Sequence, residues 1–433
     1  MLETIKNAWK VKEIRNKILY TILIILIFRI GSAIPVPFID YGQLSDMAKE
    51  SYDINAQSGN QFFSYLSILT GGGLEYGAIF AMSVTPYINS SIIIQLLTVA
   101  IPALERLSKE GEEGQKKLAQ ITRYATVILA LIQGIAYFFY LKGSGYLNVE
   151  NTFGWMLFAG AVIVLAFTAG SALVMWLGER IDVKGIGNGI SMLLFAGILS
   201  RGPQAFYMLY QYLTINPVSV VAIVIAFLAI IAFIVWMTNA ERRIPVQYAK
   251  RVVGNKMYGG QNTHIPIKVN MSGVMPIIFA SSILMLPTMI LSFMDPNEIT
   301  SFKKFLGLFG VDGAFYAVIY FILIIAFAYF YATIQFNPVE MANNLRKNGG
   351  AVPGIRPGKP TSDFISKILS RITLMGAIFL SVIAILPIII GSVGKINISL
   401  GGTSVLIMVG VALDIVKNLE SQMMMRHYKG FLD

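Results

Sequence analysis

The chain has 433 residues, of which 55% are hydrophobic and only 13% charged, and its mean hydropathy is +0.67. This composition is typical of a polytopic membrane protein and excludes a soluble chain of two or three domains. Cysteine is absent, which excludes disulfides, a thiol nucleophile and a cysteine metal site. The net charge of +11 could serve binding to nucleic acid, binding to anionic lipid, or membrane topology. The positions of the charges along the chain must decide between these roles.

Apolar stretches long enough to cross a bilayer recur along the chain. We expect ten, near 18–34, 76–101, 121–141, 153–177, 189–212, 218–237, 272–293, 313–333, 372–391 and 401–418. Residues 1–17 precede the first stretch and are rich in lysine and arginine, which predicts an amphipathic basic helix at the membrane interface. No small-residue cleavage site follows the first stretch, so we interpret it as a retained helix and not a signal peptide.

Positive charge follows the loops in alternation. Of the 34 Lys and Arg residues, 27 lie in or at the edge of the N-terminal segment, the loops after the second, fourth, sixth and eighth stretches, and the tail 419–433. The other five loops hold Lys49, Lys142, Lys303, Lys304 and Lys395, while Arg29 and Arg201 fall inside apolar stretches. The positive-inside rule therefore predicts that both termini are cytoplasmic.

A short apolar run, residues 62–70, lies between the first two stretches and ends at Gly71, Gly72 and Gly73. Nine helical residues rise only about 14 Å against a hydrocarbon core of about 30 Å, so this run is too short to span. The glycines permit a sharp turn before the next segment. Broken helices at membrane depth occur only where they face protein or a water-filled cavity. The run therefore predicts a half-inserted segment in a pore or cavity.

Carboxylates are missing from the middle of every apolar stretch, since Asp414 lies near a cytoplasmic end and Glu75 at an outer end. The two histidines, His264 and His427, lie outside the stretches. Ion-coupled carriers usually need ionisable groups in the bundle interior, so this absence counts against a carrier. Neither a metal-ligand cluster nor a nucleophile–base pair can be assembled, which argues against an enzyme. Gly358-Lys359 is followed by Pro360 and is not a nucleotide loop, so we expect no cofactor.

Uncharged pore chemistry remains possible. Ile88 and Ile92 are four residues apart and share a helix face, and Ile190 and Leu194 repeat the spacing. Such pairs usually face lipid or core. The neighbouring amide and hydroxyl side chains, such as Asn89, better suit a wall between protein and water. Rings of apolar side chains in a pore gate by dewetting and need no charge.

Two loops, 238–271 and 334–371, are longer than a chain reversal requires, and both are basic. Their candidate partner-binding residues are Arg242, Arg243, Lys250, Arg251, Arg356 and Lys359. Glycine and proline frame Arg356, which stiffens the turn and presents the guanidinium for bidentate contacts. The loops predict a docking surface for an acidic protein or an RNA backbone. The alternative is excess positive charge that serves topology alone.

Seven segments carry a family likeness that extends in order over the whole chain. They are residues 29–32, 34–37, 85–97, 185–191, 263–270, 353–358 and 401–404. In these segments the chain resembles the SecY family, the central subunits of the bacterial protein-translocation channel. The resemblance implies an all-α polytopic fold with ten transmembrane helices in two pseudo-symmetric five-helix halves, 18–212 and 213–418, and a re-entrant plug helix. Transport of polypeptide is an expectation from the likeness alone.

The resemblance also implies roles for single residues. The pore ring maps onto Ile88, Ile92, Ile190, Leu194, Ile278 and Ile407. The plug, about 61–73, maps onto Phe62, Phe63, Tyr65, Leu66, Ile68, Leu69, Gly71, Gly72 and Gly73. A lateral gate to lipid, between the second and third and the seventh and eighth helices, maps onto Thr85, Gln133 and Asn270.

The partners that the resemblance implies are SecE and SecG as bound subunits, and the SecA motor or the ribosome at the basic loops. The cargo is an unfolded polypeptide with its signal sequence, and transmembrane segments leave into membrane lipid. The location is the bacterial plasma membrane. A secondary transporter with discontinuous helices is the alternative function, and a membrane-bound enzyme is a weaker one.

Overall fold

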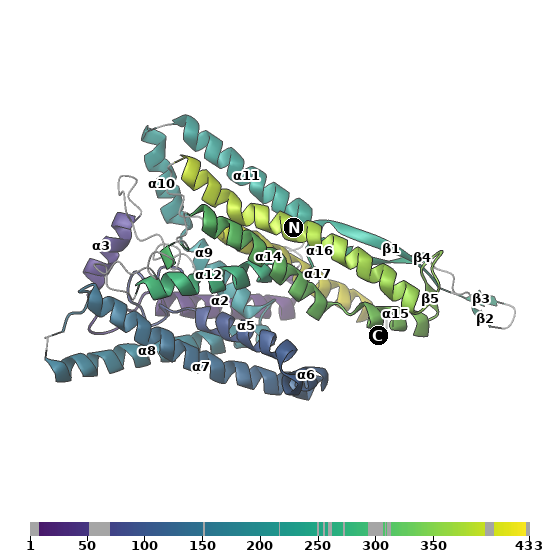
Figure 1. The fold of residues 1–433 in the computed structure, drawn as a ribbon, viewed down its shortest axis with the longest axis horizontal. Coiled ribbons are helices and arrows are strands. Elements are labelled where there is room, and N and C mark those ends of the chain that lie inside the picture. Colours follow the sequence, from purple (N-terminus) through teal and green to yellow (C-terminus); the bar gives the residue numbers. More distant parts are fainter. Residues whose placement is uncertain are drawn as a thin grey trace.

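The protein is described here by a computed structural model that covers residues 8–51, 70–149, 152–215, 217–248, 251–253, 256–258, 262–271, 273–292, 306–307, 309, 313–394 and 402–429. Helices dominate it (Figure 1). The first half contains α2 (Lys12–Gly31), α3 (Tyr41–Ser51), α5 (Thr85–Ala100), α6 (Pro102–Lys109), α7 (Glu112–Gly143), α8 (Phe153–Lys184), α9 (Gly189–Leu199) and α10 (Gly202–Ile215). The second half contains α11 (Pro217–Asn239), α12 (Met275–Ser292), α14 (Ala314–Gln335), α15 (Pro338–Lys347), α16 (Lys359–Gly394) and α17 (Gly402–Lys429).

Each of the ten expected stretches contains a helix. Among the described residues, five helices are long and apolar enough to span on their own, or six if α5 and α6, bent by 102°, count as one span. Stretch 189–212 is broken at Ser200 and Arg201 into α9 and α10, and stretch 76–101 becomes helical only at Thr85. At the N-terminal end, α2 begins at Lys12 and runs into the first stretch, so residues 12–17 form one continuous helix with it.

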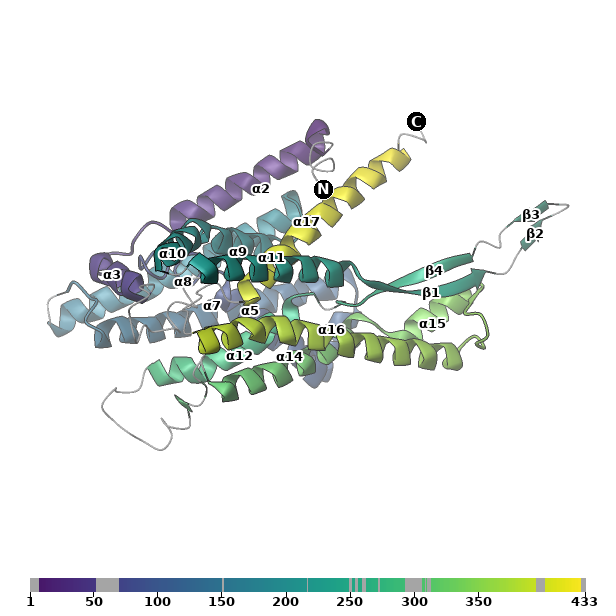
Figure 2. The same ribbon diagram turned by 90° about the horizontal axis from the view of Figure 1, so that it is seen from above.

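The helices form two packed groups that meet along a limited contact (Figures 1 and 2). In the first half, α5 packs on α7, α7 on α8, and α8 on both α2 and α9. In the second half, α12 packs on α14, α14 on α16, and α17 on both α11 and α16. The halves touch through α9 on α17, through α10 on α11 and through α5 on α12. A small apolar cluster also joins Ile14 of α2 to Leu419 of α17. This arrangement leaves the α5–α12 contact as a seam between two separately packed bundles.

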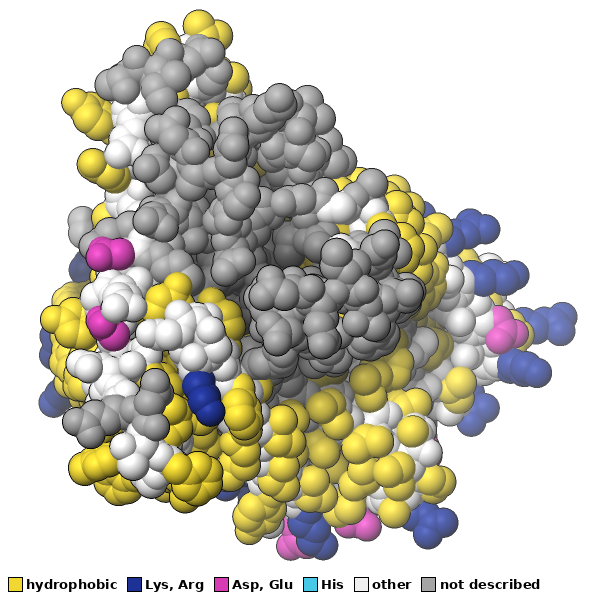
Figure 3. All heavy atoms as spheres, turned by 60° about the vertical axis from the view of Figure 1, so that its left-hand side comes forward, with side chains coloured by type: hydrophobic (Ala, Val, Ile, Leu, Met, Phe, Trp, Pro, Cys, Tyr) yellow, Lys and Arg dark blue, Asp and Glu magenta, His cyan; other side chains and the backbone are white. Residues whose placement is uncertain are grey.

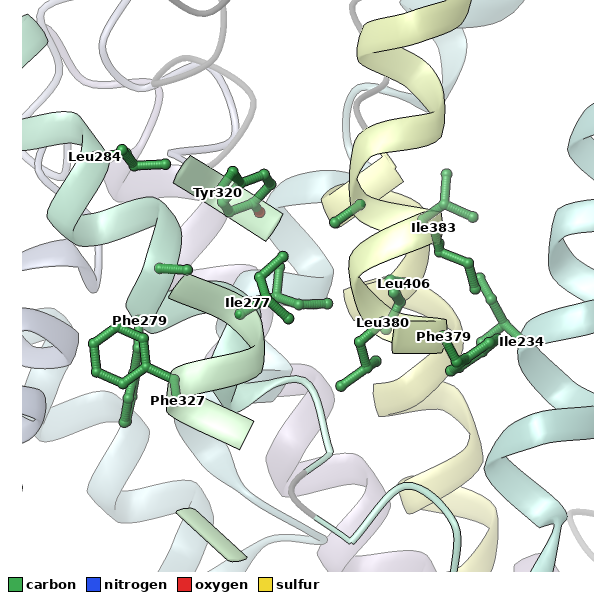
Figure 4. Packing of buried hydrophobic residues seen from close by; sticks show 14 of the residues in the cluster. Ile234, Ile277, Phe279, Leu284, Tyr320, Phe327, Phe379, Leu380, Ile383 and Leu406 are labelled. Atoms are coloured by element: carbon green, nitrogen blue, oxygen red, sulfur yellow. The ribbon is translucent and has the colours of Figure 1, made fainter. Parts of the chain in front are cut away.

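The second half has a dense apolar core (Figure 4). The rings of Phe279 on α12 and Phe327 on α14 meet edge to face, with centroids 5.8 Å apart. In lipid there is no hydrophobic driving force for two helices to associate, so close packing of this kind is what holds them together. Large apolar side chains are also exposed on the flanks, such as Ile225 and Trp236 on α11. Figure 3 shows hydrophobic side chains over much of one face, with Lys and Arg side chains projecting at its edge.

The two long basic loops form a small sheet, which packs against α15 and α16. Its strands are β1 (Glu241–Tyr248), β4 (Asn262–Lys268) and β5 (Gly350–Ala351), in the order β4-β1-β5, and β2 (Arg251–Val253) pairs with β3 (Lys256–Tyr258) farther out. β1 and β4 are antiparallel, and β5 joins β1 through Gln247↔Ala351. Ile244 and Val246 of β1 alternate with exposed residues and pack toward Ile365 of α16. The expected loop 238–271 thus contains strands, and this alternation is the ordinary signal of a half-buried strand.

Candidate pore and docking surface

Two of the helices that carry the expected ring, α5 and α9, have starts that their sequences define. Pro86 lies in the first turn of α5, where a missing N–H costs nothing, and the Ser90 hydroxyl donates to its carbonyl at 2.8 Å. At α9 the Asn188 carboxamide oxygen accepts from the N–H of Ser191 at 3.0 Å, as an N-cap residue does. The Asp182 carboxylate accepts from the N–H of Gly189 at 2.7 Å. The glycine-rich turn before α9 therefore has a fixed geometry that sets where Ile190 lies.

The structure brings the six ring residues to the place where the two halves meet. Leu194 and Ile407 are buried in one apolar cluster, and Ile88, Ile190 and Ile278 pack against it. Ile92 is buried in the core cluster of the second half, against which Ile88 and Ile278 also pack. Four helices, α5, α9, α12 and α17, supply these side chains. The ring residues thus form one continuous apolar contact between the halves.

The direction of two ring side chains follows from their chain neighbours. Ile277 and Leu406 lie in the core of the second half (Figure 4). Successive helical residues are rotated by about 100°, so the next residue along faces another side. Ile407 is accordingly buried with residues of the first half, and Ile278 contacts both clusters. A contact of aliphatic side chains without charges can exclude water, and it opens without breaking ion pairs.

The expected plug falls almost wholly outside the described residues. Phe62, Phe63, Tyr65, Leu66, Ile68 and Leu69 lie within 52–69, about which the structure says nothing. The description resumes at Thr70, which is buried. Gly71 and Gly72 have φ angles of +64° and +89°, in the left-handed region that glycine occupies readily. We call residues 70–77 the base segment.

Among the described residues, the carboxamide oxygen of Asn270 makes no hydrogen bond to the other two expected gate residues, Thr85 and Gln133. Asn270 is buried just before α12, and its carboxamide oxygen has no hydrogen-bond partner among the described residues. Thr85 is the first residue of α5, on the other side of the seam. Gln133 is half-exposed on α7 beside Gly134, which faces Val164 of α8.

Two further polar groups, which the gate assignment did not include, lie near the seam. The side-chain oxygens of Asn89 and Gln95, both on α5, are likewise buried without a partner among the described residues. Together with Asn270 they give three buried side-chain oxygens near the seam that make no hydrogen bond to the described residues. Their polarity within an apolar helix was the available signal.

The candidate docking residues gather at the end of the molecule that carries the sheet and α15. Arg242 and Arg243 are exposed on β1, and the Arg243 Nε donates to Glu241 at 2.7 Å. Arg356 is exposed in a turn between Gly354 and Gly358, which both have positive φ, and its carbonyl accepts from the Thr361 hydroxyl at 2.8 Å.

Two other candidate docking residues are less fully described. Lys359 is exposed at the start of α16, and Arg251 begins β2. Lys250 lies outside the described residues. Because β5 pairs with β1, loops that are about a hundred residues apart in sequence share one surface.

The fold and its apolar meeting point define a polytopic helical membrane protein whose two bundles close on each other through aliphatic side chains. Comparison with known proteins identifies its relatives. The sequence pattern of the SecY family matches residues 78–416, and the chain belongs to this family. Proteins named protein translocase subunit SecY are 43% identical in Mycobacterium bovis and 44% in Bacillus subtilis, each over the full length of both chains.

Solved structures share the fold at lower identity. One described as a protein conducting channel is 17% identical, with a TM-score of 0.63 over 94% of this chain and 92% of that chain. One described as Sec61 in a canine ribosome–channel complex from the endoplasmic reticulum is 16% identical, with a TM-score of 0.58 over the same shares. At these identities the structures show the fold.

Proposed function

We infer that the chain is the channel subunit of a protein translocase, through which unfolded secretory polypeptides cross the membrane and transmembrane segments pass into lipid. Full-length relatives that carry the name of this subunit support the assignment. The observation that carries the mechanism is the meeting of six aliphatic residues from four helices of both halves. Family membership makes the chain a passive pore and not an enzyme, and no finding favours the secondary transporter.

The ring suits this cargo because it has no preferred side chain. Aliphatic groups close on one another in the resting channel and dewet the constriction. Around a moving chain they can seal against residues of any kind without binding one strongly. The plug residues 62–69 and the glycines behind them complete the closure in this proposal.

The seam between α5 and α12 is the proposed lateral exit. Its contact is narrow, and the unpaired oxygens of Asn89, Gln95 and Asn270 lose no protein hydrogen bond when it parts. Thr85 and Asn270 border the seam, and Gln133 lies on the helix behind α5. A signal sequence or transmembrane segment would lie between these helices, with one side against lipid.

In this proposal the driving force comes from partners, because Gly358-Lys359 is followed by Pro360 and does not form a nucleotide loop. We propose that the ribosome and the SecA motor dock on the basic sheet, at Arg242, Arg243, Lys250, Arg251, Arg356 and Lys359. The ribosome is supported by the shared fold with a channel solved in a ribosome complex. SecE and SecG are proposed as the bound helical subunits.

The proposed location is the bacterial plasma membrane with both termini cytoplasmic. The start of α2 and the end of α17 are joined by a hydrogen bond from Lys17 Nζ to Gln422 at 3.3 Å, so they lie on the same side. The basic sheet and α15 lie toward that end of the bundle in Figures 1 and 2. Lys and Arg residues are favoured on the cytoplasmic side.

Crosslinking tests this function directly. The chain has no cysteine, so a single Ile278→Cys places a unique thiol at the meeting point. A stalled secretory chain with a thiol-reactive probe should crosslink to position 278. The matched control is Ile225→Cys on α11, which is 61% exposed on the flank. Equal crosslinking at both positions, or none at 278 during transport, would contradict a central path.

A further inference from the structure

Two arginines lie where cations are costly. Arg29 is in the last turn of α2, and Arg201 occupies the break between α9 and α10. Both fall inside stretches expected to be in the membrane, where an ionisable residue needs a partner and usually has a function. Neither belongs to the ring, the seam or the docking surface. In the structure both side chains converge on the base segment, residues 70–77.

The contacts are short and largely buried. Arg29 Nη1 donates to the carbonyl of Gly71 at 2.8 Å, and the Ser200 hydroxyl approaches the same oxygen at 3.4 Å. Arg201 Nη2 lies 2.6 Å from Glu75 Oε1, with the two side chains only 11% and 7% exposed. Charge-assisted bonds of this length are roughly twice as strong as neutral ones.

The glycines are needed for these approaches. A Cβ on Gly71 would stand 2.7 Å from the Gly197 Cα and 2.8 Å from Arg29 Nη1. A Cβ on Gly72 would stand 2.8 Å from Arg201 Nη2. At Gly71 the clash is with backbone that cannot give way, and both residues have positive φ, so glycine is favoured at both positions. The glycines therefore let the Arg29 guanidinium reach the Gly71 carbonyl and the Arg201 guanidinium pass close to Gly72 on its way to Glu75.

Further bonds hold the rest of the base segment to the same half. The Tyr137 hydroxyl of α7 donates to the carbonyl of Leu74 at 3.2 Å, and the Val36 N–H donates to Gly77 at 2.9 Å. Just beyond it, Ala78 forms an isolated antiparallel bridge with Pro35. All these partners belong to the first half, so the base segment would move with that half as a unit.

We propose that Arg29, Arg201 and Glu75 form a charged clamp that keeps the base segment fixed to the first half throughout transport and so sets the resting seal. The proposal rests on the proposed channel function. Its physical basis is that a buried ion pair is costly to break, because the partner that remains is an uncompensated charge. Opening must then take place at the seam, and not at Gly71–Gly73.

Ion leak through the resting channel tests the clamp. We expect Arg201→Gln and Glu75→Gln to raise conductance in planar bilayers at least about tenfold, which corresponds to about 1.4 kcal/mol of lost closed-state preference. The matched control is Arg123→Gln, which breaks the exposed pair Arg123–Glu179, 2.7 Å long and with side chains 48% and 26% exposed. Exposed pairs contribute little, so its leak should stay at the wild-type level. Wild-type leak in both clamp variants, with normal gel-filtration profiles, would overturn the proposal.

A charge exchange covers the case in which a single variant does not fold. Glu75→Arg combined with Arg201→Glu restores the pair in reverse, and we expect it to leak less than either single charge reversal. If the exchanged protein folds but leaks as much as the single variants, the pairing is irrelevant and the proposal fails. Channel function is judged separately, by transport in the wild-type chain.

A reversible tether tests whether the base segment stays in place during transport. Residues 35 and 78 face each other between the bonds Val36 N–H to Gly77 and Ile79 N–H to Ile34, so they are a non-hydrogen-bonded antiparallel pair. Their Cα atoms are expected about 4.5 Å apart, within the range of disulfides. Pro35→Cys with Ala78→Cys introduces the only thiols. The oxidised protein should transport at the rate of the reduced protein. A block that is relieved by reductant would show that the segment must detach, and would overturn the clamp.

Discussion

At the scale of single residues, the ring depends on the absence of polar groups. Ile407 is buried at the contact of the halves, with Leu194 in the same cluster. We expect Ile407→Asn, or Ile92→Asn, to make the closed channel leak small ions. A buried amide without a partner costs about 1–3 kcal/mol, which is roughly a ten- to hundredfold shift toward a wetted state. Resting conductance in planar bilayers measures it.

The control for this substitution keeps the side chain apolar. Ile407→Leu preserves the volume, and aliphatic exchanges of this kind usually cost less than about 1.5 kcal/mol. Its conductance should match the wild type. If Ile407→Asn is as tight as Ile407→Leu, the ring does not form the barrier.

Residue patterns in the sequence predicted part of this arrangement. The spacing of Ile88 and Ile92 places both on one helix face, whatever the rest of the fold. The clamp could not be predicted, because Gly71 and Arg201 are far apart in sequence and no local periodicity relates them. The signal that was available was the cost of a cation inside an apolar stretch. It predicts a partner for Arg201 without saying which.

At the scale of elements, the turn that contains Arg356 has a fixed backbone and exposes one positive charge. Gly354 and Gly358 adopt positive φ, and Thr361 bonds the Arg356 carbonyl. We expect Arg356→Glu to reduce motor-driven export about tenfold or more while leaving insertion intact, because a lost charge-assisted contact is worth about 1.5–3 kcal/mol. Export by purified components into vesicles measures the effect.

Arg346→Glu is the matched control for charge. Arg346 is exposed in the last turn of α15, within the same basic surface, but no glycine turn fixes it. If Arg346→Glu reduces export only slightly while Arg356→Glu reduces it strongly, Arg356 makes a specific contact. Equal effects would mean that only net charge matters, as the topology alternative holds.

The plug is also an element-scale prediction. Deleting residues 63–69 should leave an assembled channel with a poor resting seal, because Thr70 and the clamped base segment remain in place. Conductance and gel filtration measure the two properties. A protein that no longer assembles would show that the deleted run is structural. A protein that assembles and seals as well as the wild type would remove the plug assignment.

Elements were predictable where one feature dominates. Long apolar stretches predicted the helices, because spanning a bilayer requires about 20 apolar residues. The break between α9 and α10 was missed, although Gly202-Pro203 after Arg201 is a typical helix start. The strands were missed because charged residues and Pro245 interrupt the apolar alternation of β1. Their pairing depends on β4 and β5, which lie far along the chain.

At the scale of the whole molecule, each half has its own core. The core cluster of the second half draws on α11, α12, α14, α16 and α17, with Ile92 as its buried member from the first half. A separate cluster around Phe167 lies wholly in the first half. The halves therefore resemble two domains that share an interface. The pseudo-symmetry of the two halves was expected from the family resemblance. It could not be predicted from the residues, because no repeat is visible in the sequence.

This independence predicts that the chain can be divided. Expressed together, residues 1–216 and 217–433 should associate in the membrane and support export, because the cut lies between α10 and α11 and leaves both cores intact. The loss of one covalent connection costs mainly association entropy, which the α9–α17, α10–α11 and α5–α12 contacts must offset. Co-purification through a tag on one piece measures association, and export into vesicles measures function.

A cut after Lys184 is the contrasting case, because it divides the first half inside its packing. The cut separates Asp182 from Gly189, although the Asp182 carboxylate accepts a hydrogen bond from the Gly189 N–H at 2.7 Å. It therefore frees the turn that sets the start of α9. The Thr21 hydroxyl, which accepts from the Ile186 N–H at 3.2 Å, would lose a fixed partner. We expect these pieces to associate poorly and to leak where they do associate. If this cut is tolerated as well as the one at 216, the halves are not the units of the structure. The seam would then be one helix contact among many, and a channel that opens between α5 and α12 would lose its structural basis.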